Sequence, residues 1–142
     1  MFVATREIDL HRSTEGDVVD VTQQVQDVVT DCGLDEGSAH VFVSGSTGAV
    51  TTMEFEPGLK KDLFRALECL APSRGEYAHD EMWHDGNGHS HVRASLLGPS
   101  LVVPVLNGRL ALGRWQQIVF LELDNKPRDR RLLVQVIGRT NG

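Results

Sequence analysis

The strongest constraint on the fold is an Asn-Gly dipeptide that separates two apolar runs in the last third of the chain. Asn107-Gly108 follows the run Leu101–Leu106 and precedes Leu110–Leu112. An Asn-Gly pair in this setting is typical of the two-residue turn that joins antiparallel strands, because both residues accept positive φ. Apolar runs at 115–123 and 132–137 predict two more strands, so this third of the chain should form an antiparallel sheet.

Two helices are expected in the first half of the chain. Apolar residues recur every three or four positions over 21–32 and again over 59–70, which follows one face of a helix. Alternation over 2–10 and the runs 39–43 and 50–55 predict further strands. The fold class we predict is α+β: a mainly antiparallel β-sheet or sandwich with two helices packed on one face, in a single domain over residues 1–142.

Charge and hydropathy narrow the possible partners. The 142 residues carry fourteen Lys and Arg against twenty Asp and Glu, a net charge of −6. Binding to nucleic-acid phosphates needs a surplus of basic side chains, so we expect no nucleic-acid partner. Because there is no apolar run of about 18 residues and no signal-peptide pattern at Met1, we expect a cytoplasmic protein without a membrane partner.

The apolar periodicity disappears over residues 71–91, which predicts a long functional loop. This stretch holds four of the six histidines: His79, His84, His89 and His91. If residues 89–93 are extended, His89 and His91 point to the same face. With a third imidazole from His79 or His84 they would form a zinc site, while Asp80 and Asp85 would orient the rings or hold magnesium. The alternative is a set of polar loop residues that bond the backbone. We call residues 79–91 the histidine loop.

Two small-residue segments are candidates for binding an anion. Gly86-Asn87-Gly88 allows positive φ and close approach of backbone amides. The segment 44–48 offers further amides and the hydroxyls of Ser46 and Thr47, or it is a simple turn between strands.

Three more polar residues complete the candidate site. Arg93 and Ser95 follow the histidines at every second position, and a guanidinium matches the geometry of phosphate. The alternative for Arg93 is a surface salt bridge. Gln116 opens a strand that is otherwise apolar, which indicates a polar network at the site or at a subunit interface.

Three runs of the sequence carry a resemblance to a known family. They are Tyr77-Ala78-His79-Asp80, Asp85-Gly86-Asn87-Gly88-His89-Ser90-His91-Val92-Arg93-Ala94-Ser95, and Gly113-Arg114-Trp115-Gln116-Gln117-Ile118. Together with chain length and element order, they make the chain similar to the YjbQ family, which is often described as secondary thiamine-phosphate synthase. The resemblance implies a small α+β homotrimer whose site lies near subunit boundaries and is built from the histidine loop.

One position departs from the family pattern. Many members have a His-Thr-Thr-Ala-like motif where this chain has Ser46-Thr47-Gly48-Ala49, so a serine replaces the first histidine. If that histidine binds metal in relatives, His84 or His89 would replace it here.

The resemblance and the candidate residues predict an enzyme that acts on an anionic, phosphorylated small molecule. The reaction implied by the family name joins a pyrimidine pyrophosphate to a thiazole phosphate, and it needs charge neutralisation at the departing pyrophosphate. The expected catalytic residues are His79, Asp80, His91 and Arg93; the expected substrate-binding residues are Ser46, Thr47, Asp85, Gly86, Asn87, Gly88, Ser95 and Gln116; the expected ligands of zinc or another divalent metal are His79, His84, His89 and His91. Two alternatives stay open: a metal-dependent hydrolase that activates water with the same histidines, and a non-catalytic trimeric protein that binds a metal or metabolite.

The apolar runs at 101–106 and 118–121 also bear on assembly. Exposed strands of this kind promote aggregation unless they are covered, and two helices cover only one face of a sheet. We therefore expect the other face to pack against neighbouring subunits, with the threefold symmetry that the resemblance implies. In such a trimer the histidine loop of one chain would meet the turn 44–48 or the strand 114–117 of the next.

Overall fold

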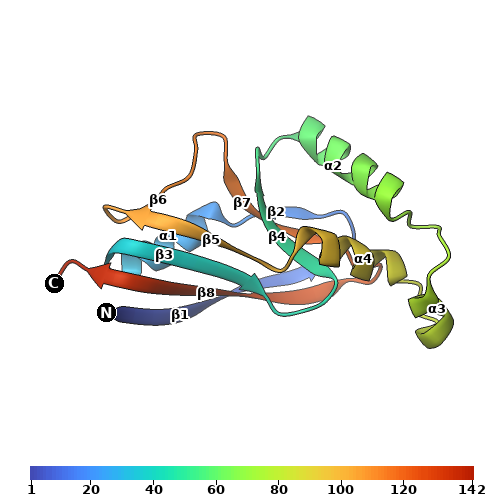
Figure 1. Cartoon of the computed structure of the whole chain (residues 1–142), viewed down its shortest axis with the longest axis horizontal. Coiled ribbons are helices and arrows are strands. Elements are labelled where there is room, and N and C mark those ends of the chain that lie inside the picture. Colours follow the sequence, from blue (N-terminus) through green and yellow to red (C-terminus); the bar gives the residue numbers. More distant parts are fainter.

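The computed structural model describes all residues from 1 to 142 and contains two antiparallel sheets and four helices (Figure 1). The larger sheet has the strand order β1-β8-β3-β5-β6, and the smaller one has the order β2-β7-β4. The strands are β1 (Phe2–Ser13), β2 (Val18–Asp20), β3 (Leu34–Val43), β4 (Gly48–Met53), β5 (Ser100–Leu106), β6 (Arg109–Leu110), β7 (Gln117–Glu122) and β8 (Arg128–Thr140). Every strand pairing is antiparallel, and the predicted α+β class is confirmed.

The two helices expected from the apolar spacing form where predicted. Helix α1 (Thr22–Asp31) begins where the Asp20 carboxylate accepts an amide of the first turn, and it ends before Gly33, whose φ is +64°. Helix α2 (Pro57–Leu70) begins at a proline, whose fixed φ suits the first turn, and the Glu56 carboxylate caps its first amides. No helix of the chain is both long enough and apolar enough to cross a bilayer.

The prediction that residues 71–91 lack regular structure was wrong. This segment contains helix α3 (Ala78–Trp83) and the start of helix α4 (Gly88–Leu97), with a left-handed His84 between them. Apolar periodicity missed α4 because the buried side of this helix carries His89, Ser90 and Arg93 instead of aliphatic residues.

The apolar core lies in two layers on either side of the smaller sheet. One face of that sheet and α1 pack against the inner face of the larger sheet, where Val25, Val41 and Phe120 belong to one buried cluster. The other face is covered by α2 and α4, whose Leu67 and Ala94 pack with residues of β4 and β7 in a second cluster. This stacking holds α3 and α4 at one end of the molecule, beside the turn between β3 and β4 (Figure 1).

The outer face of the larger sheet carries exposed apolar side chains. Phe42 of β3 is 38% exposed, and Val102 and Leu106 of β5 are 59% and 55% exposed, while their sequence neighbours point into the core. Val3 of β1 extends the same surface and is 55% exposed. The helices lie on the other side of this sheet, so the face is uncovered within one chain.

Strands β3 and β8 approach most closely at a pair of glycines in register, Gly37 and Gly138. A Cβ added to Gly37 would lie 2.0 Å from the Ile137 carbonyl oxygen, and one added to Gly138 would lie 2.1 Å from the Glu36 carbonyl oxygen. Their φ values of +155° and +156° belong to a region that side-chain-bearing residues rarely adopt. Both positions therefore require glycine.

A Gly138→Ala variant tests this requirement. We expect it to lower the free energy of unfolding by about 3 kcal/mol, because the new methyl overlaps the backbone of β3. Gly113→Ala is the matched control: the nearest atom to an added Cβ is 3.6 Å away, and Gly113 is not among the positive-φ residues. The control should stay within about 0.5 kcal/mol of the wild type in urea unfolding. Equal losses in both variants would contradict the assignment.

Candidate functional site

A polar cavity of about 410 Å³ lies where three segments of the chain meet. These are the turn between β3 and β4, the segment that joins α3 to α4, and the start of β8. The lining residues are Gly45, Ser46, Thr47, Asp85, Asn87, His91, Asp124, Arg128, Asp129 and Arg130. No apolar side chain lines the cavity, so it suits a charged ligand better than an apolar one. One chain supplies both the histidine loop and the turn with Ser46 and Thr47, so these two segments meet without a neighbouring subunit.

His79 and His91 come together on the histidine side of this cavity. Their ring centroids are 4.3 Å apart, and His79 Nε2 lies 3.3 Å from Asp85 Oδ1. In the orientation that satisfies both amide atoms, the Asn87 nitrogen donates to His79 Nε2 at 3.0 Å and to Asp85 Oδ1 at 2.9 Å. Ligand atoms of His79, Asp80 and Asp85 all lie within 4.8 Å of one another, close enough for one metal ion to bind all three.

Asp80 has a second role, since it fixes the start of α4. Its Oδ1 accepts the amide of Gly88 at 2.9 Å, which stabilises the N-terminal end of the helix. Gly88 is required there, because an added Cβ would lie 2.5 Å from Tyr77 Cβ. The amide of Gly88 is therefore used within the chain, and Gly86 stays exposed with a φ of +69°.

The other two histidines lie apart from this cluster. His84 is exposed at the end of α3, beside Tyr77 and Glu81. His89 is buried, and its Nε2 lies 2.5 Å from Glu15 Oε1. The prediction that His89 and His91 share a face was wrong: residues 88–97 form a helix, in which residues two apart point to nearly opposite sides.

Arg93 lies outside the cavity and ties α2 to α4. It is buried, its Nη2 donates to Glu68 Oε2 at 2.6 Å, and its Nε donates to the Ala71 carbonyl at 2.9 Å. A hydrogen bond from the Ser73 amide and the Arg93 guanidinium lower the pKa of Glu68 below 4.5. Arg93 therefore forms a salt bridge, as the alternative interpretation of this residue expected. The salt bridge links two helices and does not lie on the open surface.

Ser95 and Gln116 also lie outside the cavity. The Ser95 hydroxyl is exposed and donates to the His91 carbonyl one helical turn earlier. Gln116 lies in the connection between β6 and β7, and its Nε2 donates to Thr52 Oγ1 at 3.1 Å. Neither Ser95 nor Gln116 hydrogen-bonds a side chain on the histidine side of the cavity; Gln116 bonds Thr52 and the Gly113 amide instead.

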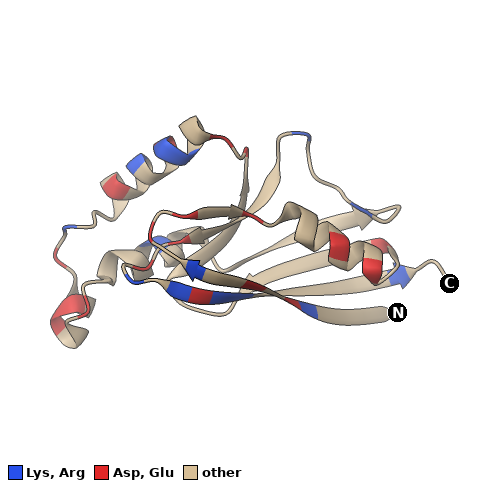
Figure 2. Ribbon diagram, turned by 180° about the vertical axis from the view of Figure 1, so that it is seen from behind, with Lys and Arg blue, Asp and Glu red and all other residues tan.

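The floor of the cavity is a buried ionic network that sequence reasoning missed. Glu122 is fully buried and accepts from Arg130 through both oxygens, at 2.8 and 2.5 Å, and from the Ser13 hydroxyl at 2.6 Å. Thr47 accepts from Arg130 Nη2 at 2.8 Å and donates to Asp124 Oδ2 at 2.9 Å. Figure 2 shows basic and acidic residues next to one another at the start of β8, where this network lies.

A signal for this network is present in the sequence. Glu122 interrupts the apolar run 118–123, and a carboxylate within a buried strand is rarely fully buried unless it is paired. Asp124 is also buried; burial raises its pKa, but hydrogen bonds from Thr47, Arg128 and the Lys126 amide outweigh that effect, so the pKa of Asp124 is lowered from 3.8. Asp124 is therefore a structural anion held in place by its donors.

The fold and the cavity define a class: a small α+β protein in which two stacked antiparallel sheets carry a charged cavity at one end. Within that class, the chain belongs to the UPF0047 protein YjbQ-like family, whose sequence profile matches residues 6–139. The resemblance seen in the sequence is thereby confirmed.

Relatives are similar to this chain over almost its whole length. A UPF0047 protein from Methanothermobacter thermautotrophicus is 41% identical over 98% of this chain and 95% of its own length. A UPF0047 protein from Archaeoglobus fulgidus is 39% identical over 92% of this chain and 99% of its own length. A crystal structure of a YbjQ-like protein of unknown function from Sulfolobus solfataricus P2 has a TM-score of 0.91 at 31% identity and covers 97% of this chain and 99% of that one. A hypothetical protein from Aeropyrum pernix K1 has a TM-score of 0.87 at 33% identity and covers 96% and 99%.

Acid unfolding should depend on Asp124. Because its folded pKa is lowered, the ionised carboxylate contributes stability that is fully present above the unfolded pKa and is lost as the pH falls through the folded value. We expect Asp124→Asn to lower the free energy of unfolding at neutral pH by about 1–3 kcal/mol, and to flatten its further loss below about pH 4. Asp62→Asn, at an exposed position of α2, is the control and should follow the wild type. An Asp124→Asn curve that overlays the wild type would contradict this role.

Proposed function

We propose that the chain is an enzyme that acts on a phosphorylated small molecule in the polar cavity, with a divalent metal ion on the histidine side. The observation that supports this proposal is the meeting of two kinds of group in one cavity. Imidazole and carboxylate groups from the histidine loop face it, and so do the turn with Ser46 and Thr47 and the two arginines of β8. Metal ligands beside cationic and hydroxyl groups suit a substrate with phosphoryl oxygens.

The donor set on the histidine side fits a divalent cation. His79 offers a ring nitrogen, Asp85 offers a carboxylate oxygen, and Asp80 has a second oxygen besides the one that accepts the Gly88 amide. Nitrogen and oxygen donors of this kind suit zinc, and the carboxylates also suit magnesium. His91, whose ring lies against that of His79, is the candidate for a further ligand or for moving a proton. His84 and His89 are not part of this donor set.

The reaction that the family resemblance favours is thiamine-phosphate synthesis. The thiazole nitrogen attacks the methylene carbon of the pyrimidine substrate, the bond from that carbon to pyrophosphate oxygen breaks, and the electron pair leaves with pyrophosphate. A bound metal ion would supply Lewis-acid stabilisation of the departing oxygen. The chain itself would bind the phosphoryl oxygens through donors along the cavity wall, and that binding would orient the two substrates.

Metal content is the first test of this proposal. Protein purified without chelators should retain a divalent transition metal, zinc first, as measured by mass spectrometry of the elements. His79→Ala should lose the metal because it removes the only imidazole in the three-residue donor set. His84→Ala is the control: it removes an imidazole that directly follows the same short helix but lies outside the donor set, and this variant should keep the metal. Wild-type protein without metal, or metal retained in His79→Ala, would count against the metal site.

Turnover separates this function from its rivals. Incubation with a pyrimidine pyrophosphate and a thiazole phosphate should yield thiamine phosphate and pyrophosphate in equal amounts, and the yield should fall in His79→Ala but not in His84→Ala. Release of phosphate without a coupled product would identify a hydrolase. Metal retention without turnover of any phosphorylated compound would identify a binding protein.

The exposed apolar face of the larger sheet supports a proposal about assembly. Phe42, Val102 and Leu106 lie on a sheet face that no helix covers, and such a face invites association. A closed symmetric oligomer covers this face without growing into an open-ended fibre, and the family resemblance favours threefold symmetry.

A homotrimer should be visible by light scattering at micromolar concentration. We expect a mass of three chains, against 15.7 kDa for one chain. Val102→Lys should dissociate the assembly, because the interface would bury an unpaired charge. Lys60→Ala, on α2 and away from this face, is the control. A wild-type mass of one or two chains would contradict the trimer.

A further inference from the structure

We infer that Arg130 and the turn Gly45–Thr47 form the phosphoryl-binding half of the cavity. This inference rests on the proposed function and names the groups that hold the anionic end of the ligand. Arg130 is separate from the histidine side, and it was not among the candidate residues from the sequence, whereas Gly45 lies within the candidate segment 44–48.

The guanidinium of Arg130 is fixed on two edges and free on the third. Nε and Nη2 donate to the two oxygens of Glu122, and Nη2 also donates to the Thr47 hydroxyl. Nη1 donates to no atom of the chain, although the residue as a whole is only 7% exposed. Because the guanidinium is already fixed by Glu122 and Thr47, its unused N–H groups point in one direction. A ligand that binds them therefore costs no further side-chain entropy.

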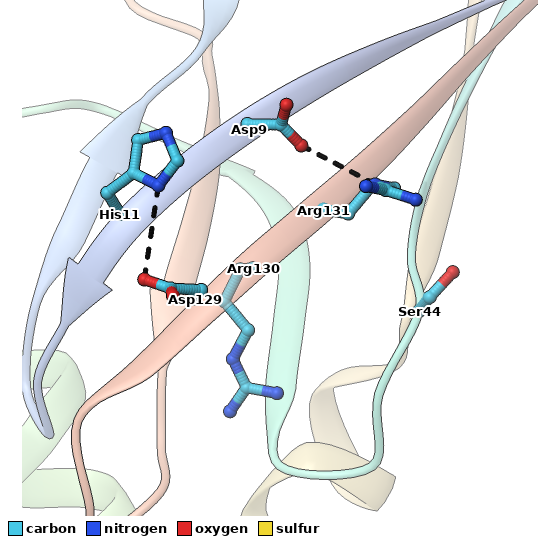
Figure 3. Close-up of a pocket in the computed structure, with 6 residues that line it drawn as sticks. All are labelled: Asp9, His11, Ser44, Asp129, Arg130 and Arg131. Atoms are coloured by element: carbon cyan, nitrogen blue, oxygen red, sulfur yellow. Dashed lines mark hydrogen bonds and ion pairs between the residues drawn. The ribbon is translucent and has the colours of Figure 1, made fainter.

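The free edge of Arg130 faces the backbone of Gly45. A Cβ added to Gly45 would lie 2.8 Å from Nη1, so the absence of a side chain keeps this edge open. The close-up in Figure 3 shows the guanidinium turned toward the loop that joins β3 to β4, away from Asp9, His11 and Arg131.

The turn itself offers unused donors beside Nη1. Among the backbone hydrogen bonds outside helices and strands, none starts from the amides of Gly45, Ser46 or Thr47, and no side chain accepts from them. Only the carbonyl of Thr47 is engaged, by the amide of Leu123 at 3.0 Å. Free amides in a turn that lines the cavity, next to a fixed guanidinium, are donors available to the several oxygens of a phosphoryl group.

The nearby carboxylates are engaged with other partners. Arg128 Nε donates to Asp124 at 2.8 Å, and Thr47 donates to the same oxygen. Asp129 accepts the amide of Arg12 at 2.9 Å, and Asp85 lies against His79. An anion in the cavity therefore meets unused donors at the turn, while Asp124 is held by its own donors and Asp85 lies with His79 on the cation-binding side.

Binding of inorganic phosphate to the purified protein tests the inference directly. In a calorimetric titration, wild-type protein should bind phosphate with saturation in the millimolar range or tighter. Arg130→Lys keeps a positive charge beside Glu122, but it replaces the forked guanidinium with a single ammonium group. That group cannot bond Glu122 and also present a donor beside Gly45. We expect its affinity for phosphate to fall at least about tenfold. Arg131→Lys makes the same change at the next, exposed position and should bind as the wild type does.

A second variant covers the case in which Arg130→Lys does not fold. Gly45→Ala leaves the ionic network in place and closes the space over Nη1, and its phosphate affinity should also fall at least about tenfold. Unchanged affinity in either folded variant, or no phosphate binding by the wild type, would overturn the inference.

The same titrations distinguish this inference from the proposed function. Phosphate binding that depends on Arg130, without turnover of any phosphorylated compound, would support the phosphoryl site and contradict the proposed enzyme activity. If the wild type turns over substrate but the Arg130 and Gly45 variants bind phosphate as tightly as it does, only the assignment of the phosphoryl site is contradicted.

Discussion

The pairing of Glu122 with Arg130 is the interaction on which the cavity depends. Burying two charges costs several kcal/mol for each ion unless the geometry and the surrounding hydrogen bonds offset it. Here the carboxylate receives three donors, from Arg130 and Ser13, and the Asp124 amide adds a fourth at 3.1 Å. These contacts join β7, β8 and the end of β1, and Thr47 brings in the turn before β4. The polar groups that fix the backbone of the turn are thus the same ones that orient the guanidinium beside it.

The histidine side is held by different means. Asp80 fixes the start of α4, Asn87 joins His79 to Asp85, and Arg93 ties α4 to α2 through Glu68. These contacts are polar and act together with the packing of Ala94 of α4 in the second apolar cluster. Hydrogen bonds and ion pairs of this kind hold the side chains of the cavity in fixed orientations and leave its walls polar.

The sequence predicted the elements that bury aliphatic side chains and missed those that bury polar ones. The longer strands, α1 and α2 repeat apolar residues with the period of their structure, so local patterns identify them, whereas the three-residue strand β2 was not predicted. Helix α4 buries His89, Ser90 and Arg93, and no pattern of hydropathy reveals that. The extended conformation assumed for residues 89–93 then put His89 beside His91, an error that the helix corrects. His79, Asp85 and the turn with Ser46 and Thr47 were identified by residue type, but their meeting with Arg130 depends on contacts between residues 83 positions apart.

The pairing of β1 with β8 has a consequence for how the chain acquires its fold. Phe2 pairs with Gly138, and β8 lies between β1 and β3, so an interior strand of the larger sheet is the last of its five strands along the chain. Until β8 arrives, β1 has no neighbour in this sheet, and one edge of β3 is open. Contacts this distant along the chain slow folding, because a long loop must close before they form. Until β8 has been synthesised, the nascent chain holds β3 and β5 as a partial sheet with unpaired edges, and β8 then completes the larger sheet and brings Arg130 to Glu122 in the same step.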